Sequence, residues 1–271
     1  MNILSWNVAG IRATIKKGGL DFLLCEEWDI VCFQETKAEE DQVKLSNDLG
    51  NIYPYRYWKS CQGITQRKGL NGTSIWSKKK PIREITPPSF DVEGRITALE
   101  YPECILVTVY TPNSQSIKSE RHKHRIEEWD VKFLEFVKEL NKICPTIICG
   151  DLNVARENKD VFAPDKMRNK CAGFIDAERI NFEKYIMEGW VDSYREKYPD
   201  REGAFTYWDQ KIKTRRPENL GWRIDYFLVP EKIKENIKSA EILPEIMGSD
   251  HCPITLEIDL KKHPRKIKVI E

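Results

Sequence analysis

Short apolar segments recur along the whole chain, and many of them are rich in β-branched residues. Segments of about four to eight such residues favour β-strands. Strands are expected at residues 2–8, 29–33, 73–76, 96–101, 105–110, 146–149, 224–229 and 254–258. Several segments are apolar at every position instead of at alternate positions, which is typical of a sheet that is covered on both faces.

Helical periodicity occupies several intervals between these segments. The clearest pattern spans residues 119–143, with apolar side chains three to four residues apart at Ile126, Trp129, Phe133, Phe136, Val137 and Leu140. One face of this helix is therefore expected to pack on a sheet. Two further helices are predicted at residues 176–189 and 20–28.

The strands are spread over the whole length, and no internal repeat, low-complexity tract or Gly/Ser linker separates them. This pattern predicts one domain over residues 1–271. Strands with two apolar faces are most simply covered when two sheets pack together and helices lie outside them. We therefore expect an α/β protein, a four-layer α/β sandwich in which two packed mixed β-sheets are flanked by helices.

The composition is typical of a globular, soluble protein, with 40% hydrophobic and 32% charged residues among 271. No segment approaches the ~20 apolar residues of a membrane span, so no membrane association is expected. Because residues 2–8 already predict a strand, no signal or transit peptide is expected. The expected location is intracellular, in the nucleus of a eukaryote or the cytoplasm of a prokaryote. The eight cysteines form no Cys-x-x-Cys pair, which favours buried free thiols over a disulfide framework or structural zinc.

The formal net charge is only +1, from 44 basic and 43 acidic residues, so the bulk charge does not point to nucleic acid. The basic residues are nevertheless clustered at 78–80, 121–125, 211–216 and 261–268. Any one such cluster is more often a solvated face than a surface that binds a polyanion. A nucleic-acid substrate therefore has to be argued from the chemistry of particular residues.

Six segments place polar, chemically active side chains at the ends of apolar strands. They are Trp6-Asn7-Val8-Ala9-Gly10, Gln34-Glu35-Thr36-Lys37, Tyr110-Thr111-Pro112-Asn113, Gly150-Asp151-Leu152-Asn153, Gly221-Trp222-Arg223-Ile224-Asp225-Tyr226-Phe227 and Gly248-Ser249-Asp250-His251. An ionised carboxylate is not buried in a strand without a partner, because desolvation costs several kcal/mol. The acids are therefore expected to lie at strand ends around a common cleft. Four carboxylates together with His251 are what metal-assisted attack of water on a phosphate ester requires.

Each segment also has a purely structural interpretation. These interpretations are a turn at residues 7–10, a helix cap or an ion pair with its neighbour for Glu35, an Asx turn at residues 151–153, a core aromatic at Tyr110 and a buried neutral imidazole at His251. Taken singly, each of them is favoured over a functional role. The coincidence of six such segments at strand ends favours a common site instead.

The order of these motifs resembles that of the exonuclease III family of apurinic/apyrimidinic (AP) endonucleases, within the endonuclease/exonuclease/phosphatase superfamily. The resemblance covers nearly the whole chain, from residue 3 to residue 254. The segments that are similar to this family rather than to the superfamily at large are 34–37, 150–155 and 221–227, and residues 172–174 with 178–179 also fit.

The resemblance implies Mg²⁺ as the cofactor, with Mn²⁺ as an alternative. Glu35 would ligate the ion, helped by Asn7 and Asp250, and few protein ligands suffice because Mg²⁺ prefers oxygen and keeps several waters. The resemblance leaves open a second ion, which would lie near Asp151, Asn153 and His251.

The resemblance also implies catalytic roles. Asp151 would orient and deprotonate the attacking water, and Asn153 would hold that water or the transition-state oxygens. Asp225 would hydrogen-bond His251 and favour its imidazolium form beside the phosphate. The groups expected to contact the substrate are Tyr110 and Asn113 at the phosphate or leaving group, and Tyr207 and Trp222 around a base-free sugar.

The implied activity is Mg²⁺-dependent hydrolysis of double-stranded DNA on the 5′ side of abasic sites during base excision repair. It would leave a 3′-hydroxyl and a 5′-deoxyribose phosphate. Secondary 3′→5′ exonuclease and 3′-phosphodiesterase activities and a monomeric state are also expected. The alternatives are a phosphatase or lipid phosphodiesterase of the superfamily, and a DNA-binding relative that has lost catalysis.

Three departures from the family pattern bear on these expectations. Ala9 stands where the family usually carries Asp or Asn, so one contact around the metal is missing. Residues 114–116 lack the arginine that some relatives push into DNA, and residues 211–215 are basic where some relatives carry an apolar wedge. Metal affinity and the way in which the duplex is opened are therefore expected to differ from those of the relatives.

Overall fold

The computed structural model describes residues 1–25, 27–63, 67 and 69–262. Its strands are β1 (Asn2–Asn7), β2 (Ile30–Gln34), β3 (Tyr55–Lys59), β4 (Thr73–Ser77), β5 (Arg83–Ile85), β6 (Ile96–Glu100), β7 (Ile105–Tyr110), β8 (Thr146–Asp151), β9 (Trp190–Asp192), β10 (Asp225–Pro230), β11 (Ile237–Ile242) and β12 (Ile254–Ile258). Its α-helices are α1 (Ile11–Lys16), α2 (Asn47–Ile52), α3 (Glu120–His124), α4 (Asp130–Ile143), α5 (Pro164–Met167), α6 (Asp176–Met187) and α7 (Ser193–Lys197). Of the basic cluster at 261–268, residues 263–268 lie outside the described part.

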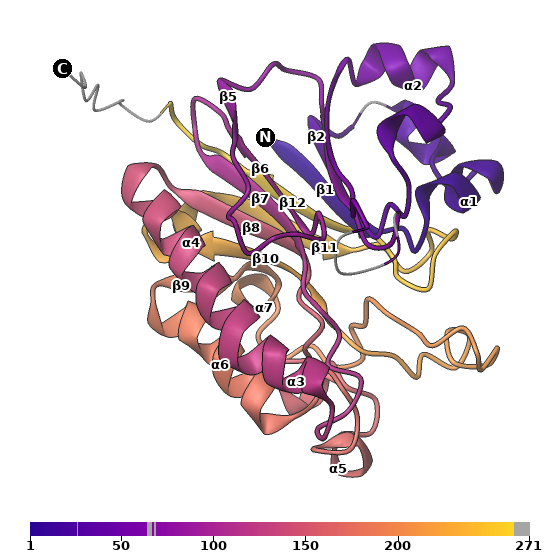
Figure 1. Ribbon diagram of the computed structural model, residues 1–271, viewed down its shortest axis with the longest axis vertical. Helices are drawn as coiled ribbons and strands as arrows, with labels where there is room; N and C mark the ends of the chain where they lie inside the picture. Colours follow the sequence, from indigo (N-terminus) through magenta and orange to yellow (C-terminus); the bar gives the residue numbers. More distant parts are fainter. Residues whose placement is uncertain (26, 64–66, 68, 263–271) are drawn as a thin grey trace.

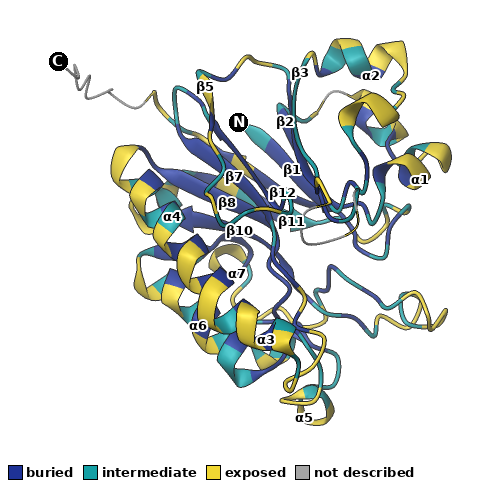
Figure 2. Ribbon diagram, in the orientation of Figure 1, coloured by how far each residue is buried: buried dark blue, intermediate teal, exposed yellow. Residues whose placement is uncertain are grey.

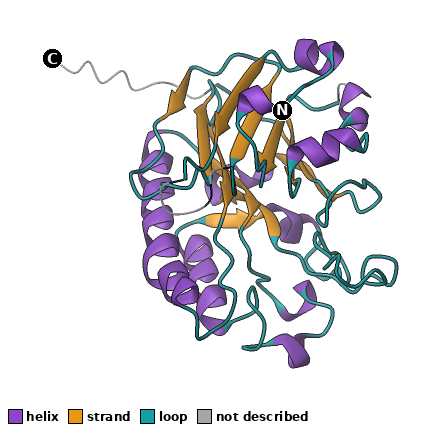
Figure 3. Ribbon diagram, turned by 45° about the vertical axis from the view of Figure 1, so that its right-hand side comes forward, coloured by secondary structure: helices purple, strands orange, loops and turns teal. Residues whose placement is uncertain are grey.

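The strands form two six-stranded sheets. The first has the order β11-β12-β1-β2-β4-β3 and the second has the order β5-β6-β7-β8-β10-β9. Both sheets are mixed, because β1 runs parallel to β2 and β7 runs parallel to β8 while the other pairs are antiparallel. The sheets lie at the centre of the molecule with helices on both sides (Figures 1 and 3). The prediction of a four-layer α/β sandwich is confirmed.

Apolar side chains fill all three interfaces between the four layers. Cys32 of the first sheet and Leu106 of the second belong to the cluster between the sheets. On the outside of the first sheet, Trp6 of β1 and Leu49 of α2 belong to one apolar cluster. Phe133 of α4 belongs to the cluster on the outside of the second sheet. The inner strands are therefore buried on both faces, whereas the helices keep exposed outer surfaces (Figure 2).

The apolar pattern does not predict four strands, namely β3, β5, β9 and β11. All four are the outer strands of their sheets. An edge strand has one neighbour and remains partly open to solvent, so its sequence need not be continuously apolar. Strand β3 has no fully buried residue, and β5 begins with the exposed Arg83 and Glu84. The apolar pattern therefore predicts the strands that are buried on both faces and misses the edge strands.

Two of the predicted helices differ in detail. The helix predicted at 119–143 is divided by a π-helical turn, η3 (Arg125–Trp129), between α3 and α4. The prediction of a helix at 20–28 is wrong, because the described residues of this segment form a 3-10 turn, η1 (Asp21–Cys25), and no α-helix. Asp29 already pairs with Asn2 through a backbone hydrogen bond of 2.8 Å, so the chain must be extended before β2 begins.

Two expectations drawn from composition can be compared with the described residues. Within the described ranges, no helix combines the length and the apolar character needed to cross a membrane. All eight cysteines lie in these ranges and are free thiols, and six of them are buried. The expectation of free thiols without a disulfide framework agrees with the structure.

Candidate active site

The ends of five strands bring the predicted site residues together. Asp151 is the last residue of β8, and it pairs with Tyr110 at the end of β7 on one side and with Asp225 at the start of β10 on the other. In the first sheet, Asn7 ends β1, and Glu35 directly follows β2. Each polar group therefore lies where an apolar strand stops, as the pattern of the six segments predicted.

These groups surround a pocket of about 290 Å³. Every predicted site residue except Asn7 and Asp225 lines it, and those two lie in contact with its floor through Asp151 and His251. The full lining is Glu35, Tyr110, Asn113, Asp151, Asn153, Ala172, Gly173, Tyr207, Asp209, Trp222, Ile224, Asp250 and His251. The sequence signals therefore converge on one cavity.

Asn7 joins the two sheets at the floor of the pocket. Its Nδ2 donates hydrogen bonds to Oε1 of Glu35 at 3.0 Å and to Oδ2 of Asp151 at 2.9 Å. Its Oδ1 accepts a hydrogen bond from the backbone N–H of Ala9 at 3.0 Å. This geometry makes Asn7 an orienting group for two carboxylates, and its amide oxygen keeps one lone pair beyond the bond from Ala9.

His251 and Asp225 form a buried pair. Nδ1 of His251 lies 2.8 Å from Oδ2 of Asp225, and Nε2 lies 3.8 Å from Oδ2 of Asp151. Thr206 donates its hydroxyl proton to the same Oδ2 of Asp225 at 2.6 Å. Burial would lower the pKa of His251, but Asp225 and Asp151 raise it to about 10. The imidazole is therefore cationic at neutral pH, which disagrees with the alternative of a neutral buried histidine.

Asp151 has the opposite electrostatic situation. Burial, together with the neighbouring charges of Asp225 and Glu35, raises its pKa to about 7, although His251 acts to lower it. A carboxylate with a pKa near 7 can accept a proton close to neutral pH, which suits a general base. The floor of the pocket thus combines a cationic imidazole with a basic carboxylate.

Asn153 occupies a left-handed backbone conformation, with a φ of 49°. Its N–H donates to Oδ1 of Asp151 at 2.8 Å, which is the Asx turn considered above. Its Nδ2 donates to the carbonyl of Thr111 at 2.8 Å, and its Oδ1 accepts from Nδ2 of Asn113 at 3.1 Å. The turn is therefore present, and it fixes the side chain of Asn153 beside Asp151 instead of excluding a functional role.

Glu35 likewise forms the ion pair of the structural interpretation and also lines the pocket as a functional carboxylate would. Its Oε2 lies 2.6 Å from Nζ of Lys37, so the ion pair considered above exists. Burial would raise the pKa of Glu35, but Lys37 and Asn7 lower it. The group is therefore an ionised carboxylate at the pocket. Burial and the nearby Glu35 also raise the pKa of Tyr110, so its hydroxyl stays protonated.

The donor set fits a hard divalent cation. Carboxylates of Glu35, Asp151 and Asp250 and the amide of Asn153 line one pocket, and such oxygen ligands are those that Mg²⁺ prefers. One buried carboxylate oxygen, Oδ1 of Asp225, has no hydrogen-bond partner among the described residues. The negative charges of Asp225 and Glu35 help to raise the pKa of Asp151. A bound cation would offset these charges.

Aromatic side chains form one wall of the pocket. The ring of Tyr207 lies 4.8 Å from the ring of His251, and Tyr207 also bridges to Trp222 through the backbone. Behind Trp222 lies Phe174, edge-on at 6.2 Å. Gly173 lines the same wall, and a Cβ at this position would come within 3.3 Å of the carbonyl of Asn153. The segment 172–174, which fitted the family pattern, therefore lies close against Asn153.

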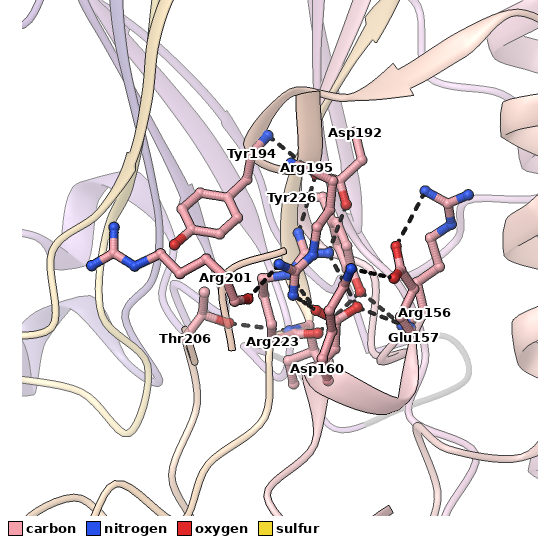
Figure 4. A network of polar contacts seen from close by, with 12 residues as sticks. Arg156, Glu157, Asp160, Asp192, Tyr194, Arg195, Arg201, Thr206, Arg223 and Tyr226 are labelled. Carbon is pink, nitrogen blue, oxygen red and sulfur yellow. Dashed lines mark hydrogen bonds and ion pairs between the residues drawn. The ribbon is translucent and has the colours of Figure 1, made fainter. Parts of the chain in front are cut away.

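A buried network that the sequence did not predict fixes the segment bearing Trp222 and Asp225. Between them, Arg223 donates to Asp160 at 2.8 Å through Nε and to Asp192 at 2.6 Å through Nη2 (Figure 4). Arg195 also reaches Asp160, at 2.5 Å. Arg223 is buried with its partners, so the network lies behind the pocket and not in it.

The basic cluster at 211–216 is divided between solvent and structure. Arg215 stacks over the ring of Phe162 at 4.4 Å, and Arg216 donates to the carbonyls of Pro244, Ile246 and Ser249. Residues 211–214, in contrast, are exposed. The two arginines therefore anchor the base of this segment, and its outer part is exposed to solvent.

Comparison with known proteins identifies close relatives over nearly the whole chain. The Endonuclease/Exonuclease/phosphatase family profile matches residues 4–251. An exodeoxyribonuclease of Bacillus subtilis is 41% identical over 264 residues, covering 96% of this chain and 100% of that protein. A DNA-(apurinic or apyrimidinic site) endonuclease of Dictyostelium discoideum is 39% identical over 264 residues, covering 96% of this chain and 71% of that protein.

Solved structures agree with these relatives. An AP endonuclease from Archaeoglobus fulgidus superposes with a TM-score of 0.84 at 25% identity, covering 96% of this chain and 100% of that chain. A 3′ phosphatase from Neisseria bound to a product DNA hairpin superposes with a TM-score of 0.83 at 25% identity, covering 96% and 99% of the two chains. As the order of its motifs predicted, the chain belongs to the endonuclease/exonuclease/phosphatase family, among relatives that are exodeoxyribonucleases and AP endonucleases.

Proposed function

We propose that this protein is a Mg²⁺-dependent phosphodiesterase that cuts double-stranded DNA on the 5′ side of abasic sites, in base excision repair. The products would be a 3′-hydroxyl and a 5′-deoxyribose phosphate, with 3′→5′ exonuclease and 3′-phosphodiesterase activities as secondary functions. The observation that carries the proposal is the pairing of a cationic His251 with a basic Asp151 at the floor of a pocket walled by Tyr207 and Trp222. The relatives with AP endonuclease names support the choice of substrate.

In this proposal, the residues of the floor share the work of hydrolysis. Asp151 accepts a proton from the attacking water, and Asn153 orients that water through its fixed amide. The imidazolium of His251, held by Asp225, offsets the negative charge that develops on the non-bridging oxygens of the phosphate. The neutral hydroxyl of Tyr110 donates a hydrogen bond to the phosphate or to the leaving oxygen.

Glu35 and Asp250, together with oxygens of Asp151 and Asn153, would hold Mg²⁺ in this pocket. When bound, the ion supplies Lewis-acid neutralisation of the phosphate charge. The protein groups retain their own tasks of positioning and proton transfer. The wall of Tyr207 and Trp222 offers an apolar surface to a sugar that lacks its base.

Incision of a labelled duplex tests the proposal directly. With Mg²⁺, the purified protein is expected to nick a duplex with one abasic site on its 5′ side, and EDTA should abolish the reaction because the carboxylates would lose their cation. The undamaged duplex of the same sequence serves as the control. A product of β-elimination on the 3′ side, or a rate unchanged by EDTA, would contradict the proposal. Stronger turnover of an inositol phosphate or lipid phosphodiester would favour the alternative within the family.

Ala9 allows a second prediction, about the metal. It is half-buried, has a φ of 47°, and donates its N–H to Asn7, so it lies next to the group that orients Glu35. Aspartate tolerates this left-handed conformation at least as well as alanine, so Ala9→Asp should fold. Because one partner around a metal typically changes affinity or activity by about 10- to 100-fold, the variant should reach half-maximal incision at lower Mg²⁺ than the natural protein.

Titration of incision rate against Mg²⁺ for both proteins measures this effect. Ala9→Asn adds an amide of the same size without the charge, so it shows whether the charge of the aspartate or a hydrogen-bonding group alone lowers the Mg²⁺ midpoint. An unchanged or higher Mg²⁺ midpoint for Ala9→Asp would show that the site is complete without an acid at this position. Mn²⁺ should help the natural protein more than the variant, because Mn²⁺ binds more tightly to a sparse ligand set.

A further inference from the structure

The π-helical turn η3 starts at Arg125, a fully buried arginine that the pocket does not include. A π-turn closes hydrogen bonds between residues five apart, whereas residues three or four apart share a face in an α-helix. This turn brings Arg125 and Asp130, which are five residues apart, into contact. Nε of Arg125 lies 2.8 Å from Oδ1 of Asp130, so the buried cation has an anionic partner.

The rest of the guanidinium group contacts two loops of the pocket. Nη2 donates to the carbonyl of Leu152 at 2.7 Å, and Nη1 donates to the carbonyls of Pro112 at 2.8 Å and Asn153 at 3.3 Å. A buried carbonyl without a donor costs free energy, so these three carbonyls depend on Arg125. One side chain therefore joins the loop after β8 to the loop after β7.

Rigid elements fix Arg125 in turn. Oδ2 of Asp130 accepts a hydrogen bond from Nδ2 of Asn181, on α6, at 3.2 Å. The same nitrogen donates to the carbonyl of Ile126, inside the π-turn, at 2.8 Å. Two helices thus hold the guanidinium from behind, and a site that is supported by helices is positioned more accurately than one supported by loops.

The contacts of Arg125 lie on both sides of Asn153. The carbonyls of Leu152 and Asn153 lie on either side of the Cα of Asn153, which has the left-handed φ of 49°. Asparagine adopts this conformation more readily than most L-residues, and the contacts on both sides keep the residue in it. In this conformation, Asn153 donates a hydrogen bond to Asp151 and accepts one from Asn113.

We propose that Arg125 is a positioning residue, which holds the loops bearing Asp151, Asn153 and Asn113 in the geometry required for hydrolysis. It does not touch the substrate and acts only through the backbone of these loops. The proposal rests on the proposed function for its kinetic readout, but its structural readout does not depend on the substrate.

Two variants test this role. Arg125→Lys keeps the charge but cannot donate to all four acceptors, and Arg125→Met keeps only the apolar stem. Lys123→Met is the matched control, since it removes one positive charge from the exposed surface two residues away. With abasic duplex and Mg²⁺, both Arg125 variants should lose about 10- to 100-fold in kcat. KM should stay within about threefold of the control, because Tyr207 and Trp222, which form the aromatic wall of the pocket, do not depend on Arg125.

A double-mutant cycle separates positioning from mere stability. If Arg125 acts through Asn153, then Arg125→Lys should cost less than about threefold in the background of Asn153→Ala, because the oriented amide is already gone. Below the unfolding temperatures of all variants, a purely structural role would leave the same factor in both backgrounds. The amide hydrogens of residues 152–154 should also exchange faster in Arg125→Lys than in Lys123→Met.

Several outcomes would overturn the proposal. These are a kcat within twofold of the control, an equal loss in both backgrounds, a change confined to KM, or unchanged hydrogen exchange at residues 152–154. Failure of both Arg125 variants to fold would assign the residue to folding and would overturn it as well. If instead the natural protein does not cut abasic DNA but exchange at 152–154 still rises, the proposed substrate fails and the positioning role stands.

Discussion

Replacement of Asp151 by asparagine is expected to lower kcat on abasic DNA by at least ~10²-fold, the lower end of the contributions of general acid–base catalysis. Asparagine has the same size, but it cannot accept the proton of the attacking water. In the natural protein, burial with the charges of Asp225 and Glu35 raises the pKa of Asp151 to about 7, so this carboxylate is basic enough for the task. Binding of abasic DNA should persist, because Tyr207, Trp222 and Asn113 remain in place.

Single-turnover incision gives the rate, and fluorescence anisotropy with a labelled abasic duplex gives the affinity. Asp200→Asn makes the same chemical change at an exposed position and should keep its turnover. If Asp151→Asn retained half of the natural turnover, the base would have to be another group at the pocket. A loss of affinity equal to the loss of rate would assign Asp151 to binding instead of catalysis.

The sequence predicts the centre of this fold better than its borders. Strands such as β7 and β8 are covered by the other sheet on one face and by α4 or α6 on the other, so their apolar character is continuous. Edge strands such as β3 need bury only part of each side chain, and their sequence carries no such signal. The division of the long helix at Arg125 is likewise invisible in the apolar spacing, because Arg125 is polar and its buried contacts include the carbonyls of Pro112 and Leu152 in other loops.

The candidate site could be predicted because its chemistry is concentrated in short segments at strand ends. The supporting contacts could not, since they join residues that are distant in the sequence. Asn7 reaches Asp151 across 144 positions, and its amide orientation is set by Ala9 and two carboxylates. Arg223 was visible in its motif, but its partners Asp160 and Asp192 carry no pattern that distinguishes them from surface acids.

Replacement of Arg223 by methionine is expected to lower the free energy of unfolding by about 3–5 kcal/mol, the range for removing one partner of a buried ion pair. Methionine fills the space of the arginine stem but leaves the carboxylate of Asp192 buried without its cation. Asp160 keeps Arg195 as a partner but loses the two hydrogen bonds that Arg223 donates to it. Urea unfolding of both proteins at neutral pH measures the difference, and Arg201→Met, at an exposed position, is the control.

The loss should depend on pH in a direction that identifies its cause. Burial would raise the pKa of Asp160, but Arg223 and Arg195 hold it below its ordinary value of about 3.9. A depressed pKa in the folded state contributes stability above the unfolded pKa, and that contribution disappears as the pH falls through the folded pKa. The difference between the natural protein and Arg223→Met should therefore be complete above about pH 5 and should shrink below about pH 4.

A second substitution distinguishes an unpaired charge from a packing defect. Asp192 also caps α7, where its side chain accepts from the N–H groups of Tyr194 and Arg195. Asparagine keeps this cap and removes the charge, so Arg223→Met with Asp192→Asn should recover part of the lost stability. If the double variant is no more stable than Arg223→Met, or if the loss does not change between pH 5 and pH 3, the arginine stabilises the protein by packing. The network in Figure 4 would then not be an electrostatic support for Trp222 and Asp225.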